Sequence, residues 1–146
     1  MSKIFISYSW DNEEHKKWVK NLATDLRKNG VDVILDQWDL KLGAESTHFM
    51  EESVTNSERV LIILTNNYRD RCNNRIKGVG YETSIITAEI YQNVPTRKFI
   101  PVLREGDWTN TPPIYLRGRL GLDMTEDEQY DARLTELLRE LCQVSP

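Results

Sequence analysis

Apolar residues in this chain fall into short runs that alternate with longer segments in which apolar positions recur at helical spacing. Strand-sized runs stand at residues 4–6, 31–35, 59–65 and 99–103. The run 59–65 is apolar on both faces, which is typical of a strand in the middle of a parallel sheet. Pro101 removes a ladder hydrogen bond from the last run, which favours a place near the edge. A fifth strand is expected at 114–116, after a turn at Pro112-Pro113.

Segments with helical periodicity follow these runs. The apolar stripe of the first one consists of Trp18, Val19, Leu22, Ala23 and Leu26. Asp11 is its predicted N-cap, with Glu14 three residues later to complete a capping box, and Asn29-Gly30 supplies the left-handed residue that ends the helix. Further helices are expected at residues 45–56 and 81–92, and toward the C-terminus from Leu134 to Leu141.

Strands that alternate with helices imply right-handed crossovers and a parallel sheet covered on both faces. The sequence therefore predicts an α/β, flavodoxin-like three-layer fold, with a five-stranded parallel sheet in the order 2-1-3-4-5 flanked by helices. In such sheets the functional crevice lies beyond the carboxyl ends of the strands, where the strand order reverses. Residues 7–11, 36–43 and 66–82 form that edge here. Trp10 and Trp38 flank strand ends at this edge, where an indole either stacks on a flat ligand or covers the rim of the core, the favoured interpretation.

Length and composition narrow the class of protein. The chain has 146 residues, of which 39% are hydrophobic and 29% charged, so a single domain over 1–146 is expected. The longest apolar run, Val60 to Leu64, is too short for a membrane span, and no secretory signal is present, so we expect a cytoplasmic protein with no membrane partner. Nineteen Lys and Arg against 23 Asp and Glu argue against a nucleic-acid partner. Cys72 and Cys142 are predicted to be free thiols.

Common catalytic and cofactor motifs are missing from the sequence. His15 and His48 have no cysteine or acidic partner at metal-ligand spacing, so both are predicted to be surface side chains and no metal site is expected. Gly78-Val79-Gly80 precedes a helix, but Thr83 stands in place of the third glycine of a dinucleotide-binding fingerprint. A basic stretch, which we interpret as a solvated loop, consists of Arg69, Arg71, Arg75 and Lys77.

Glu82 and Glu89 lie on the face of the predicted 81–92 helix that should turn toward the sheet. Projected at about 100° per residue, Glu82 lies within about 60° of Ile85 and Ile86. Partial burial and the neighbouring carboxylate would raise the pKa of Glu82, which suits it to general-base work or to stabilising a cationic transition state. Periodicity alone favours the alternative, in which Glu82 complements the helix dipole in the first turn.

Three segments resemble one known family. Lys3–Asp11 (KIFISYSWD) resembles box 1 of the Toll/interleukin-receptor (TIR) superfamily. Gly30–Leu40 (GVDVILDQWDL) resembles the second-strand and BB-loop segment of its SEFIR branch, and Arg59–Asn67 resembles the third strand of that branch. The resemblance extends from Lys3 to about Leu141, and it implies the same flavodoxin-like fold.

The family resemblance implies two different activities. Animal members chiefly act as adaptors that pair like with like through helices and the BB loop. Many bacterial and plant TIR members instead cleave the nicotinamide–ribose bond of NAD+ with a glutamate on the third helix, and they serve in antiphage or cell-death defence. The Tyr81-Glu82 pair resembles the catalytic tyrosine–glutamate step of several such hydrolases, whereas Gly78 departs from the tryptophan that some of them place there.

The resemblance also implies roles for individual residues. Glu82 is the implied catalytic residue, which would stabilise the oxocarbenium-like ribose left when nicotinamide departs. The implied substrate-binding residues are Ser9, Trp10, Asp36, Trp38 and Tyr81. The implied interaction loop consists of Asp39, Leu40, Lys41, Leu42 and Gly43. NAD+ enters as a substrate, and no separate cofactor is implied.

We therefore expect a bacterial-type SEFIR/TIR signalling domain of innate immunity that self-associates and hydrolyses NAD+ when assembled. The alternative is a non-catalytic adaptor that mediates homotypic protein–protein interaction. A phosphoacceptor receiver domain is set aside because Ser7-Tyr8-Ser9 and Thr65-Asn66 stand where such a domain needs acidic residues. Domains of this kind usually act with a fused sensor or effector, so we expect a module excised from a larger protein.

Overall fold

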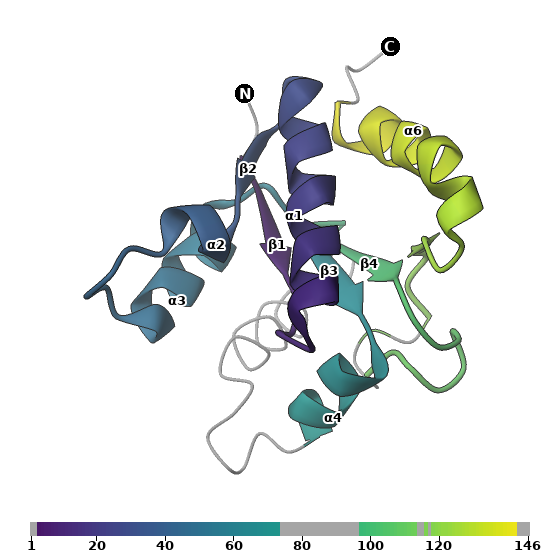
Figure 1. The fold of residues 1–146 in the computed structure, drawn as a ribbon, viewed down its shortest axis with the longest axis horizontal. Helices are drawn as coiled ribbons and strands as arrows, with labels where there is room; N and C mark the ends of the chain where they lie inside the picture. Colours follow the sequence, from purple (N-terminus) through teal and green to yellow (C-terminus); the bar gives the residue numbers. More distant parts are fainter. Residues whose placement is uncertain (1–2, 74–96, 114–115, 117, 143–146) are drawn as a thin grey trace.

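Parallel strands form one sheet in the order β2-β1-β3-β4-β5 (Figure 1) in the computed structural model, which describes residues 3–73, 97–113, 116 and 118–142. The strands are β1 (Lys3–Ser7), β2 (Asp32–Ile34), β3 (Arg59–Leu64), β4 (Phe99–Leu103) and β5 (Leu122–Asp123). Because β1 pairs with β2 on one side and β3 on the other, the strand order reverses there. The predicted fold class and strand order are confirmed.

Helices cover both faces of this sheet (Figure 1). They are α1 (Glu13–Lys28), α2 (Asp36–Asp39), α3 (Ser46–Asn56), α4 (Asn66–Asn73) and α6 (Tyr130–Leu141), and the 3-10 turn η3 (Asp127–Gln129) leads into α6. One hydrophobic cluster joins α1 and α6 to the sheet, and a second joins α3 and α4 to its other face. In the part of the chain that is described, no helix is both long and apolar enough to cross a membrane.

Side-chain alternation along the strands divides the core between these two clusters. In β1, Ile4 and Ile6 belong to the cluster with α1 and α6, whereas Phe5 belongs to the cluster with α3 and α4. Every residue from Val60 to Leu64 in β3 is fully buried. A strand covered on both faces lies in the middle of the sheet, so the predicted central position of this run is confirmed.

Of the two strands after β3, β4 forms where the sequence predicts it and β5 forms elsewhere. β4 matches its predicted bounds and lies next to the edge strand, and Pro101 pairs with Ile62 of β3. β5 pairs with β4 only from Val102 onward, so Pro101 lies outside that second ladder. The last strand of the sheet is β5 at Leu122–Asp123 and not the predicted run 114–116, of which residues 114 and 115 lie outside the described residues. A two-residue strand is too short to show a hydrophobic period.

The ends of α1 confirm one prediction and correct another. Asn12 is the N-cap, because its side chain accepts a hydrogen bond of 2.8 Å from the backbone N–H of His15. Asp11 is therefore not the cap, and its carboxylate accepts a side-chain bond of 2.8 Å from Asn67 instead. At the other end Gly30 has φ +87°, as the left-handed residue after the helix requires.

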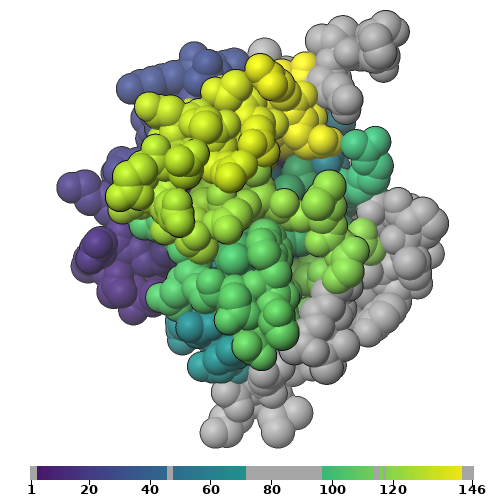
Figure 2. Space-filling view, turned by 90° about the vertical axis from the view of Figure 1, so that its right-hand side faces the viewer, coloured from purple at the N-terminus to yellow at the C-terminus, as the bar shows by residue number. Residues whose placement is uncertain are grey.

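α6 is fastened to α1 and to the start of β3 by polar and aromatic contacts. Figure 2 shows α6 (yellow) and the segment before it spread over this face of the molecule. The Tyr130 hydroxyl donates a 2.5 Å hydrogen bond to Asp25 of α1, and the Tyr130 ring meets Trp18 edge-on. At the far end of α6, Glu140 accepts a 2.9 Å bond from Arg59. These contacts fix the helix that covers this side of the sheet.

The two histidines differ in a way that the sequence analysis did not predict. His48 is exposed, and its Nε2 lies 3.4 Å from a carboxylate oxygen of Glu52. His15 was predicted to be a surface residue, but its side chain is only 8% exposed. The reason is its spacing, because residue 15 continues the apolar stripe that runs through Val19 and Leu22. Burial lowers the pKa of His15, and the nearby Asp11 carboxylate opposes that shift only in part.

The lowered pKa of His15 predicts a pH-dependent stability. Below about pH 6.5 the unfolded chain binds a proton at this position that the folded protein does not bind, so stability rises with pH. We expect the free energy of unfolding to fall by up to about 1.4 kcal/mol per pH unit as pH drops from 7 toward 5. Denaturant titrations should show this slope in the parent and in His48→Gln, and lose it in His15→Gln. An unchanged slope in His15→Gln would contradict the assignment.

Candidate functional site

Three loops meet beyond the carboxyl ends of β1, β2 and β3. Tyr8 of the loop after β1 contacts Asp36 after β2, and Ser9 lies 3.3 Å from Thr65 after β3, measured between the hydroxyl oxygens. Asn67, at the start of α4, reaches back to Asp11. The structure therefore brings together the described parts of the predicted segments, residues 7–11, 36–43 and 66–73, at the reversal point of the strand order, where ligands bind in open α/β sheets.

Asp36 joins the first loop to the start of the second. Its two carboxylate oxygens accept hydrogen bonds from the Tyr8 hydroxyl at 2.7 Å and from the Trp10 indole N–H at 2.8 Å. The Gln37 amide donates to the Tyr8 hydroxyl at 2.8 Å and to the backbone oxygen of Lys16 at 3.0 Å. We call Tyr8, Trp10, Asp36 and Gln37 the Asp36 clamp.

Tyr8 and Asp36 form the buried part of the clamp, and the Tyr8 hydroxyl keeps its proton. Asp36 is only 7% exposed, so it faces its two donors rather than solvent. Burial and then the adjacent Asp36 carboxylate raise the pKa of Tyr8 well above its ordinary value. The Tyr8 hydroxyl therefore remains a hydrogen-bond donor at physiological pH, and the carboxylate keeps both partners.

A second polar network surrounds Asp11. Its carboxylate accepts hydrogen bonds from the Ser9 hydroxyl and from the Asn67 side chain. Burial alone would raise the pKa of Asp11, but these bonds outweigh it and hold the pKa below the ordinary value. The Thr65 hydroxyl accepts a 3.1 Å bond from the backbone of Tyr68 and so caps α4. Ser9 itself is buried, and the lowered pKa of Asp11 keeps a negative charge at this edge of the sheet.

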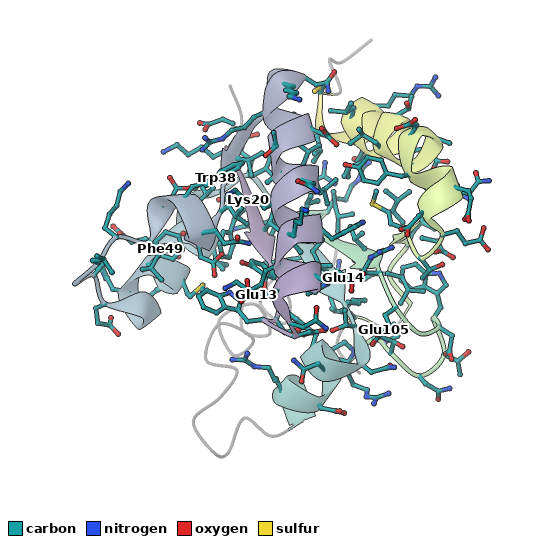
Figure 3. All side chains as sticks on the ribbon, in the orientation of Figure 1. Glu13, Glu14, Lys20, Trp38, Phe49 and Glu105 are labelled. Atoms are coloured by element: carbon teal, nitrogen blue, oxygen red, sulfur yellow. The ribbon has the colours of Figure 1, made fainter. Side chains whose placement is uncertain are left out.

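The two tryptophans that the sequence places at this edge differ in their exposure to solvent. Trp10 is 53% exposed, and the Lys16 ammonium lies 4.0 Å from its ring centroid. Trp38 is half-buried against the core that α1 covers, with the Arg27 guanidinium 4.1 Å from its ring centroid. Trp38 lies beside α1 in Figure 3. Trp10 therefore has ring surface open to solvent at this edge of the sheet, whereas Trp38 covers the rim of the core.

The loop after β2 begins as a short helix, α2, which the sequence analysis did not predict. The Asp39 side chain accepts a 2.9 Å bond from the backbone of Leu35 and closes this turn. Beyond this turn the backbone N–H of Ala44 donates a 3.0 Å hydrogen bond to the backbone oxygen of Lys41. Leu42, at the tip of the interaction loop, is fully exposed. The loop thus combines an anchored base with an apolar tip.

Several predicted residues lie outside the residues that the structure describes. They are the predicted helix 81–92 with Tyr81, Glu82 and Glu89, the Gly78 departure, and Arg75 and Lys77 of the basic stretch. The first part of that stretch belongs to helix α4 and not to a loop, since Arg69 and Arg71 lie within Asn66–Asn73. Among the described residues, no three His, Cys, Asp or Glu side chains are grouped as metal ligands. The catalytic assignment of Glu82 therefore stays a prediction.

The structure also shows a groove that no sequence motif signals. It has a volume of about 880 Å³ and runs between α1 and the segment from β4 to α6. Its lining includes Glu14 and Glu105, labelled in Figure 3, together with His15 and Arg104. Arg104 is paired with Asp127 at 3.0 Å. Residues from distant parts of the chain form this groove, so only the folded chain reveals it.

Comparison with known proteins identifies the family. The chain matches the family described as the TIR domain over residues 4–138. It shares 38% identity with the crystal structure of a prokaryotic SEFIR domain, with a TM-score of 0.81 over 99% of this chain and 95% of that chain.

More distant structures share the fold. The TIR domain of the Toll-related receptor TRR-2 from Hydra magnipapillata is 16% identical, with a TM-score of 0.71 over 98% of this chain and 100% of that chain. The TIR domains of the activated Roq1 resistosome are 18% identical, with a TM-score of 0.59 over 99% of this chain and 86% of that chain. The chain matches no curated protein sequence. The family match, together with the extent of the likeness to the prokaryotic domain, shows that the chain belongs to the TIR superfamily and, within it, to the SEFIR domains.

Proposed function

We propose that this SEFIR domain is a signalling module that self-associates through the interaction loop, residues 39–43, and hydrolyses NAD+ once assembled. The observation that carries the proposal is Leu42, a fully exposed apolar side chain at the tip of a loop whose base is anchored. Burying one leucine against a partner contributes about 1.5–3 kcal/mol. A loop that is already ordered loses little conformational freedom when it binds, so more of that energy favours association.

The exposure of Leu42 gains its meaning from its surroundings. Single exposed leucines are common on protein surfaces and by themselves indicate nothing. Here the exposed side chain follows the α2 turn, which the Asp39 side chain closes by its bond to the backbone of Leu35. Asp36, at the start of the same turn, is bonded to Tyr8. The Roq1 TIR domains, which share this fold, belong to an activated resistosome. Both facts support self-association as the way in which this domain signals.

The crevice supports NAD+ as the substrate of the assembled domain. Trp10 offers a half-exposed indole face on which a flat ring can stack, at the same edge of the sheet as the Asp11 carboxylate. Departure of nicotinamide leaves a positively charged ribose, which a nearby ionised carboxylate stabilises. Glu82 is the proposed source of that carboxylate, on the resemblance of Tyr81-Glu82 to the hydrolases of the family. The alternative, a non-catalytic adaptor, uses the same loop and leaves Glu82 without a role.

Charge at the loop tip should strongly weaken self-association. We expect Leu42→Glu to shift the concentration for half-maximal association at least 10-fold upward, because a carboxylate replaces the apolar contact. Leu120→Glu is the matched control, since Leu120 is 96% exposed and Leu42 is 105% exposed. Sedimentation velocity over a range of protein concentrations, with and without a crowding agent, measures the self-association of both variants. Equal behaviour of the two variants would remove the loop from the interface.

NAD+ consumption distinguishes the hydrolase from the adaptor. The domain concentrated on beads should consume NAD+, and Glu82→Ala should lower the rate by about 10²–10³-fold because the transition-state charge is left unpaired. Glu89→Ala, which removes the neighbouring carboxylate of the same predicted helix, should retain most of the rate. If the clustered parent leaves NAD+ intact while Leu42→Glu still strongly weakens self-association, the domain is an adaptor.

A further inference from the structure

The ladder between β1 and β2 ends before the interaction loop begins. The last paired residues are Phe5 and Ile34, so backbone hydrogen bonds of the sheet do not hold Asp36 or the residues after it. The Asp36 clamp lies immediately beyond this point. It joins Asp36 to Trp10 and Tyr8, which stand 26 and 28 residues earlier in the chain. Side chains therefore continue the attachment that the ladder no longer provides.

The α2 turn is held on two sides. On one side Asp36 and Gln37 are bonded to the first loop and to the backbone of α1. On the other side Trp38 packs against the core beneath Arg27. Asp39 at the end of the turn is exposed, Leu40 is half-buried, and residues 41–45 are all exposed. The boundary between the fixed base and the free tip thus falls at residues 39–40.

We propose that Tyr8 and Trp10, acting through Asp36, are positioning residues for self-association, which hold the interaction loop in its projecting conformation before a partner binds. This inference rests on the proposed function, because it takes the loop as the interface. Asp36 then has a structural task at the base of the loop in place of the substrate contact that the family resemblance implies. A pre-formed loop binds at lower protein concentration than one that must be ordered on contact.

Two substitutions remove hydrogen bonds of the clamp, two at Tyr8 and one at Trp10, and keep an aromatic ring at each position. Tyr8→Phe deletes the hydroxyl that donates to Asp36, and Trp10→Phe deletes the indole N–H on a side chain that is half exposed and so tolerant of change. Tyr130→Phe is the matched control, because the Tyr130 hydroxyl also donates to an aspartate, Asp25, but joins α6 to α1. Denaturant titration of all three variants confirms that each is folded.

The readout that reports on the loop itself is tryptic cleavage after Lys41, an exposed residue within it. Cleavage of native protein follows the fraction of time that the segment is open. We expect Tyr8→Phe and Trp10→Phe to raise the cleavage rate at Lys41 about 10-fold and to weaken self-association, measured by sedimentation velocity. Tyr130→Phe should leave both unchanged.

The outcomes separate this inference from the proposed function. Unchanged cleavage at Lys41 in both clamp variants overturns the inference. Faster cleavage with undiminished self-association also overturns it, and if Leu42→Glu still strongly weakens association, the proposed interface stands. If Leu42→Glu has no effect either, the proposed interface fails and the inference fails with it. Faster cleavage together with weaker association, confined to the clamp variants, supports the inference.

Discussion

The burial of β3 on both faces is the constraint on which this structure depends. Val60 to Leu64 expose no surface, so helices must cover the sheet on either side. The chain meets this demand by returning through crossovers between parallel strands, and parallel strands place all their carboxyl ends at one edge. The polar loops that follow β1, β2 and β3 therefore converge there, whatever function they serve.

At that edge the backbone pairing of β1 and β2 ends, and side-chain hydrogen bonds connect the loops instead. Asp36 is buried and Asp11 is partly buried, and a carboxylate that loses contact with water is stable only when donors surround it. Tyr8 and Trp10 supply the donors for Asp36, and Ser9 and Asn67 supply them for Asp11. The residues of box 1 thus have a structural reason to occur together with the start of the interaction loop. A mutation here acts on both loops at once.

The family to which the chain belongs explains why two functions fit one architecture. A fold of this type positions a crevice and a projecting loop, and neither feature by itself decides between an adaptor and an enzyme. Under the proposed function the enzyme needs a carboxylate at this edge, and the family resemblance assigns that role to Glu82. The exposed Trp10 ring and the exposed Leu42 are compatible with a domain in which assembly and substrate binding occur at the same edge.

The sequence by itself determined the layers, the central strand and the family, because hydrophobic period and contiguous motifs are local signals that survive without tertiary context. It also held the signal for the burial of His15, whose spacing matches Val19, although the residue type concealed it. Only the tertiary structure decided that Asn12 and not Asp11 caps α1, and that Trp38 covers the core while Trp10 is open to solvent. Each of those outcomes depends on which partners arrive from distant segments, and such partners become neighbours only when the chain has folded.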